Sequence, residues 1–175
     1  MDGGLTVLTE IFLTTPSLVI LILLASIVRK VEILLMALII AVFAWAWPAK
    51  TIRAQVLSLR ERGFVYLAKL SGLSSIEIIV KHMIPNILPF LGSYFAVVVN
   101  AATLSAVGLE VIGLGPRHTT TLGIIFYWAM MHSAVTRGLI WWWLPPCIIL
   151  FLLFLSLFLI QRGLDEIANP RLRGE

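Results

Sequence analysis

The run LIWWWLPPCIILFLLFLSLFLI at residues 139–160 contains no charged side chain. A helix needs about 20 mostly apolar residues to cross a hydrocarbon core about 30 Å thick, and this run is long enough to do so. Residues 33–49 and 86–109 are also free of charge. Residues 11–28 are charge-free as well, although a polar segment around Pro16 makes their start prone to a kink. The sequence therefore predicts four membrane-spanning helices.

The composition agrees with this fold class. Hydrophobic residues make up 60% of the chain and charged residues only 13%, whereas soluble domains carry about 25% charged residues. Membrane β-strands alternate apolar and polar positions over about ten residues, and no such alternation is present. We therefore expect an all-α integral membrane protein in which residues 1–175 form a single transmembrane domain.

The distribution of Lys and Arg predicts the orientation, because an excess of these residues marks the cytoplasmic side of a membrane protein. Of the 13 Lys and Arg residues, nine lie in the segment 50–82 or after residue 160, and four lie in the turn 29–30 or the loop 110–138. This count predicts a multi-pass protein of the plasma or inner membrane with both termini in the cytoplasm. Residues 122–136 are apolar but too short to span, which indicates an external re-entrant or interfacial helix.

The net charge of +4 is explained by basic residues at the membrane flanks, which meet anionic lipid. Membrane lipid is therefore an expected partner. Nucleic acid is not, because no basic stripe with interleaved aromatic residues occurs outside those flanks.

The segment 51–85 predicts two cytoplasmic helices. The first covers residues 51–71 and ends at Gly72, since glycine adopts the left-handed conformation that closes helices. The second begins with Ser74 and Glu77, which have the spacing of a capping box. It is expected to stop near Met83, because the residue before Pro85 is disfavoured in helical conformation.

The second cytoplasmic helix has one apolar face. Its residues recur at helical spacing: Ile76, Ile79, Val80 and Met83. Such a helix either lies on the membrane surface or docks into a groove of a partner protein and transmits the partner's motion to the spans. The pattern alone leaves both interpretations open.

The sequence lacks the motifs that are typical of nucleotide-binding, aspartyl-hydrolase and metal sites. A phosphate-binding loop needs a lysine that follows a glycine, and the chain has none. The only Asp residues, Asp2 and Asp165, lie outside the apolar runs, and the three His residues are scattered. No catalytic residue, cofactor or metal site is predicted. Asn100 lies deep in the third span and Glu110 at its outer end, so both are candidates for a translocation path; simple solvation is the alternative for Glu110.

A family resemblance rests on FVYLAKLSG at residues 64–72 and HMIPN at residues 82–86. Together they resemble the cytoplasmic signature loop of binding-protein-dependent ABC permeases, which reads Glu-Ala-Ala, three residues, Gly, and a proline about a dozen residues later. Four residues of this chain keep the family spacing: Ala68, Gly72, Pro85 and Asn86. Tyr66 stands where the family usually has Glu, and Leu67 where it has the first Ala.

The resemblance to the family extends to Gly113-Leu114-Gly115. Residues 165–173 are similar to the C-terminus of the peptide-type (dipeptide, oligopeptide and nickel) subfamily. The resemblance implies a permease subunit that works with separate ABC ATPase subunits, a second permease subunit and an external solute-binding protein. Short peptides are the implied solute, with oligosaccharides as the alternative. The implied ATPase-coupling residues lie in the loop at about 64–86: Ala68, Gly72, Ser74, Ile76, Glu77, Ile79, Val80, Met83 and Pro85.

The chain resembles only the last four of the six spans usual for that subfamily. A truncated gene, a split subunit and a misplaced start are all compatible with this. Two other functions also stay open: a membrane scaffold without transport activity, and an ion-coupled carrier.

Overall fold

The computed structural model describes residues 2–27 and 32–168, and every regular element in these residues is a helix. The predicted all-α fold class is confirmed. Four of the basic residues used to predict the orientation lie outside the described residues: Arg29, Lys30, Arg171 and Arg173.

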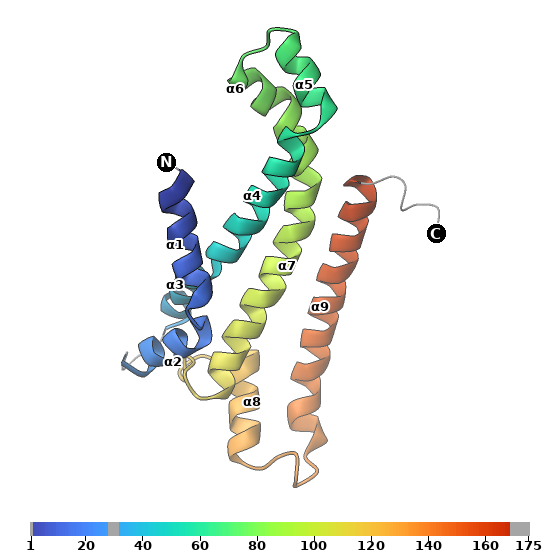
Figure 1. Cartoon of the computed structure of the whole chain (residues 1–175). Coiled ribbons are helices and arrows are strands. Elements are labelled where there is room, and N and C mark those ends of the chain that lie inside the picture. Colours follow the sequence, from blue (N-terminus) through green and yellow to red (C-terminus); the bar gives the residue numbers. More distant parts are fainter. Residues whose placement is uncertain (1, 28–31, 169–175) are drawn as a thin grey trace.

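Two long helices form the axis of the molecule. Helix α7 (Ile84–Val111) and helix α9 (Ile140–Ala168) run antiparallel and pack side by side (Figure 1). They belong to the continuous helical stretches Ser75–Val111 and Ile140–Glu166, which are 37 and 27 residues long and contain 18-residue windows with mean hydropathies of 1.7 and 2.6, so each is long and apolar enough to contain a membrane span. These helices confirm the spans predicted at 86–109 and 139–160.

A third span is formed only if two helices are taken together. Helix α3 (Ile33–Ala44) and helix α4 (Ala46–Arg60) meet at an angle of 40° at Trp45. The pair includes the predicted span 33–49 and continues beyond it to Arg60.

The span predicted at residues 11–28 is not one continuous helix. The structure breaks this run at Thr15–Pro16, between helix α1 (Asp2–Thr14) and helix α2 (Ser17–Ile27). Pro16 has no N–H to donate and disfavours a helical conformation at the residue before it, which favours a break at this point. Proline alone does not require a break, because Pro89 lies inside α7 and Pro145 and Pro146 lie inside α9. Neither helix is long enough to span a membrane by itself. Among the described residues, the number of helices that are long and apolar enough to span is two, or three if the bent pair counts as one span, where the sequence predicted four.

Helix α8 (Leu122–Met131) follows α7 at the end of the molecule where α9 begins (Figure 1). Its 10 residues extend about 15 Å, half the thickness of a hydrocarbon core. The prediction of a short apolar helix here is confirmed, but the helix ends at Met131 and not at residue 136. Ser133 follows with a φ of +53°, which terminates the helical geometry.

The core is small for the length of the chain. Met36 and Ile40 of α3 are buried against Leu109 of α7. Many large apolar side chains are exposed along α9, among them Phe151, Leu155 and Phe158. Lipid tails are as apolar as leucine, so this exposure is compatible with a membrane environment.

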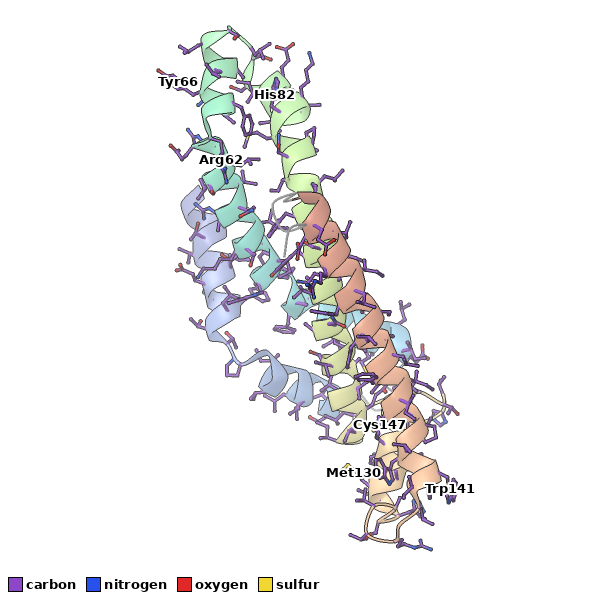
Figure 2. All side chains as sticks on the ribbon, turned by 90° about the vertical axis from the view of Figure 1, so that its right-hand side faces the viewer. Arg62, Tyr66, His82, Met130, Trp141 and Cys147 are labelled. Carbon is purple, nitrogen blue, oxygen red and sulfur yellow. The ribbon has the colours of Figure 1, made fainter. Side chains whose placement is uncertain are left out.

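The segment between α4 and α7 projects beyond the other helices as a hairpin, residues 63–83. It consists of helix α5 (Gly63–Leu70), helix α6 (Ser75–Ile78) and the π-helix η1 (Ile79–Met83). The start of α1 and the end of α9 point to the same end of the molecule (Figure 1). Figure 2 shows Tyr66 and His82 at this end and Met130 and Trp141 at the other.

The single predicted helix at 51–71 is also corrected. The chain leaves helical geometry between α4 and α5, where Arg62 is extended with a ψ of 143°. Gly63 follows directly, and glycine is a poor helix former because it loses the most backbone entropy.

Candidate functional site

The turn of the hairpin depends on a glycine. Gly72 has a φ of +77°, in the left-handed region that residues with a Cβ rarely adopt. Its N–H donates to the Lys69 carbonyl at 3.0 Å, and the Leu73 N–H donates to the Ala68 carbonyl at 3.3 Å. These two bonds form a Schellman motif, which satisfies the last carbonyls of α5. The predicted end of the first helix at Gly72 is therefore confirmed.

The predicted capping box is present at the start of α6. The Glu77 backbone N–H donates to the Ser74 hydroxyl at 3.3 Å, and the Ser74 backbone N–H donates to Glu77 Oε2 at 3.1 Å. The Lys81 ammonium lies 3.4 Å from Glu77 Oε1. Glu77 precedes the apolar run of α7. The hydrogen bonds from Ser74, followed by the interactions with Lys81, lower the pKa of Glu77 below its usual range.

The hairpin has an apolar core of its own. Val65 is 1% exposed, and it is buried together with Ala68 of α5 and Ile78 of α6. Three partly buried side chains pack against this cluster: Phe64, Leu73 and Met83. The two arms of the hairpin are therefore packed against each other through this cluster.

The outer surface of the hairpin is also apolar. Ile76 is 74% exposed and Tyr66 is 65% exposed. We call the exposed apolar side chains of the hairpin the apolar tip: Tyr66, Leu67, Leu70, Ile76, Ile79 and Val80. Apolar side chains gathered on an exposed element are typical of an interaction surface.

The structure divides the predicted coupling residues by role. Ile76, Ile79 and Val80 belong to the apolar tip. The others shape the hairpin or its connection to α7: Ala68, Gly72, Ser74, Glu77, Met83 and Pro85.

Half of the apolar tip comes from α5 and was not predicted as part of the site. The signal is in the sequence, because Val65 and Ala68, three residues apart, form the buried face of α5. That spacing leaves Tyr66, Leu67 and Leu70 on the remaining surface.

The helix does not stop before Pro85, contrary to the prediction. It widens into η1, where the Ile84 N–H donates to the Ile79 carbonyl, five residues back. Pro85 then occupies the first turn of α7, where its missing N–H is tolerated. The Asn86 side-chain amide donates to the His82 carbonyl at 2.6 Å and satisfies part of the disturbed backbone. α6, η1 and α7 therefore form one continuous stretch.

Glu110 lies at the opposite end of α7 and is only 4% exposed. The Thr121 hydroxyl donates to Glu110 Oε2 at 2.7 Å. A Cβ added to Gly123 would lie 2.5 Å from Glu110 Cβ, and one added to Gly115 would lie 3.1 Å from Glu110 Cα. The end of α7, the following loop and α8 therefore close around this side chain. The alternative prediction, that Glu110 is simply solvated, is wrong because the side chain is buried.

Asn100 is placed apart from Glu110. Its Oδ1 atom is buried and has no hydrogen-bond partner among the described residues. A cavity of about 310 Å³ between α1, α3, α4 and α7 is lined by other residues of α7, including Tyr94 and Ser105. The Tyr94 hydroxyl donates to Thr51 Oγ1 at 3.1 Å beside it. Within the described part of the chain, no three His, Cys, Asp or Glu side chains gather as metal ligands would.

The known proteins to which this chain is similar include several that are named as oligopeptide or peptide permeases. The oligopeptide transport system permease protein OppC of Mycobacterium tuberculosis is 29% identical over 99% of this chain and 59% of that protein. A Brucella ovis protein named as a peptide permease is 32% identical over 93% of this chain and 53% of that protein. OppC of Lactococcus lactis is 25% identical over 93% of this chain and 55% of that protein.

The chain therefore spans between 53% and 59% of the length of these relatives. The family model of the binding-protein-dependent transport system inner membrane component matches residues 1–174. The resemblance found in the signature loop is confirmed by this match. The chain belongs to the family of binding-protein-dependent transport system inner membrane components.

Proposed function

We propose that this chain is a permease subunit of an ATP-driven uptake transporter, and that its apolar tip docks into a separate ATPase subunit. The observation that carries the proposal is the hairpin, which projects from the bundle with a core of its own and apolar side chains outside. A rigid element that offers side chains at helical spacing fits a helix-in-groove contact. ATP hydrolysis then takes place in the partner subunit, and residues 1–175 act as one membrane domain.

Short peptides are the solute that we assign to this permease. The support comes from the relatives, whose names describe oligopeptide and peptide permeases. An external solute-binding protein delivers the peptide, and a second permease subunit completes the path through the membrane. The selection of peptides can then reside in the binding protein, so the permease needs no charged group within its spans.

The hairpin and both termini lie on the cytoplasmic side in this proposal. Two observations support it: the excess of Lys and Arg in the segment 50–82, and the common end of the molecule to which the hairpin, the start of α1 and the end of α9 point. α8 then lies outside. We assign Glu110 a positioning role in the external part of the path, because its burial and its bond to Thr121 hold α8 against α7. We also assign Asn100 to the path, because it is a polar residue deep within α7.

The test is Ile76→Asp, assayed with the ATPase subunit co-expressed. Ile76 is 74% exposed in the chain alone, and surface substitutions usually change stability by less than about 0.5 kcal/mol, so the permease should still insert and fold. In the docked state the new charge is buried without a partner, which costs about 3–5 kcal/mol. ATPase association should weaken by about 100-fold or more.

The matched control is Ile76→Leu, which keeps the volume and the apolar character of the side chain. It should retain both co-purification of the ATPase and peptide-stimulated ATP hydrolysis, while Ile76→Asp loses both. Unchanged association in Ile76→Asp would show that the apolar tip is not the docking surface. A wild-type chain that binds no ATPase subunit would instead favour the scaffold.

A further inference from the structure

A groove of about 430 Å³ lies at the base of the hairpin, between α4, α5 and the stretch from α6 into α7. This volume is within the range of about 300–1,000 Å³ that is common for small-molecule sites. The walls are mostly apolar, with Val56 and Leu59 from α4 facing Ile79, Ile84 and Ile87. The groove therefore suits an apolar chain rather than a polar solute.

Two cations line the same groove, Arg60 at the end of α4 and Lys69 near the end of α5. No carboxylate is among the described residues that line it. The ion pairs of the described chain are Lys81 with Glu77 and Arg162 with Glu166, so neither cation of the groove is paired with an acid there. The groove therefore combines apolar walls with uncompensated positive charge.

The groove lies at the beginning of α7. Ile84 and Ile87 line the groove, and they stand at the beginning of the apolar helix that is long enough to cross a membrane. On the other side of the groove, Lys69 belongs to the projecting hairpin. The groove thus lies at the boundary between the apolar span and the charged segment, where the phosphates of lipid headgroups are found.

We propose that this groove binds one anionic phospholipid, with an acyl chain against the apolar walls and the headgroup phosphate between Arg60 and Lys69. The charge selects an anionic headgroup over a zwitterionic one, and the walls require a chain-bearing lipid rather than free phosphate. The proposal needs only that α7 crosses the membrane and does not depend on docking of the ATPase. Ile79 belongs both to the apolar tip and to the groove wall, but Ile76, which tests the docking, does not line the groove, and Arg60 and Lys69 are not part of the tip, so the two proposals can fail separately.

The experiment is native mass spectrometry of the full chain, released from vesicles of phosphatidylglycerol and phosphatidylcholine mixed in equal amounts. One phosphatidylglycerol should remain bound per chain in preference to phosphatidylcholine. A basic residue near an anionic lipid surface contributes about fivefold to binding. The double variant Arg60→Gln/Lys69→Gln should therefore retain phosphatidylglycerol about 25-fold less well.

The matched control is Arg62→Gln/Lys81→Gln, which removes the same charge from the hairpin and the residue directly before it, at positions that do not line the groove. It should retain the lipid as the wild type does. Val56→Trp, at an exposed residue of the groove wall, should fill the groove and release the lipid with both cations intact.

Three results would overturn the proposal: equal retention of the two lipids by the wild type, no loss in Arg60→Gln/Lys69→Gln, or an equal loss in the control. A photo-crosslinker at Val56 that couples to a protein subunit and not to lipid would assign the groove to that subunit, and the lipid site would be wrong.

Discussion

Gly123 is the residue whose substitution tests the closure of α8 around Glu110 most directly. In Gly123→Ala the new Cβ would lie 2.5 Å from Glu110 Cβ, which is closer than carbon atoms approach in real structures. Glu110 Cβ is fixed by the backbone of α7, so rotation of the Glu110 side chain cannot relieve this contact. α8 must therefore move away from α7.

The cost follows from two contributions. Overpacking of a close contact costs about 1–3 kcal/mol, and a buried polar group that loses its partner costs about 1–3 kcal/mol more if the Thr121 to Glu110 bond breaks. For a chain of this size, a change of about 2 kcal/mol lowers the Tm by about 4–8 °C. Thermal unfolding in detergent, followed by tryptophan fluorescence, measures this shift; Trp128 in α8 is one of the reporters.

The control is Gly108→Ala, because a Cβ there meets nothing within 4 Å. Alanine is the better helix former at this position in α7, so the Tm should not fall. A double variant, Gly123→Ala with Glu110→Gly, should lose less than the sum of its single changes, since the two residues occupy the same space. If Gly123→Ala and Gly108→Ala melt alike, or if the double variant is additive, the closure described around Glu110 is wrong.

Two further predictions concern the hairpin and the orientation. Lys81→Met should raise the pKa of Glu77 toward its usual range, because it removes an opposite charge and a hydrogen bond; carboxyl-selective NMR of the full chain in detergent measures the shift, and an unchanged pKa would contradict the pairing. Since folding lowers the pKa of Glu77, the capping box contributes fully to the free energy of unfolding above the usual pKa of glutamate. This contribution is lost as the pH falls through the lowered pKa of the folded state. In a Cys147→Ala background, single cysteines at Ser71 and Thr120 should be labelled from opposite sides of sealed vesicles, and labelling of both from one side would refute the proposed topology.

The features that could be predicted from the sequence are those with a local cause. Twenty charge-free residues have few stable alternatives to a membrane helix, so α7 and α9 were predicted near their observed positions. The turn of the hairpin could also be predicted, because its cause lies within a few neighbouring residues. Gly72 permits a left-handed residue, and Ser74 and Glu77 satisfy backbone groups only three residues apart.

The features that could not be predicted depend on contacts between distant residues or on competing local signals. The spacing of Val65 and Ala68 indicates which face of α5 is buried, but it does not identify Ile78 of α6 as the partner of that face. Two prolines had opposite outcomes: Pro16 breaks its run, whereas Pro85 is accepted because η1 and the Asn86 side chain rearrange the backbone hydrogen bonds. Burial of Glu110 requires the close approach of Gly123 in a different helix.

The continuity of α6, η1 and α7 determines how a force on the apolar tip would reach the membrane. The hairpin has its own core, so a push on Ile76 moves α5 and α6 together rather than bending one against the other. η1 is the weakest part of the connection, because its wider turn and Pro85 leave fewer ordinary helical hydrogen bonds. Bending is therefore expected at residues 79–85, while the bond from Asn86 to the His82 carbonyl limits its extent. A displacement of the tip would then tilt α7 as a unit, and α8, held to the far end of α7 through Glu110 and Thr121, would move with it.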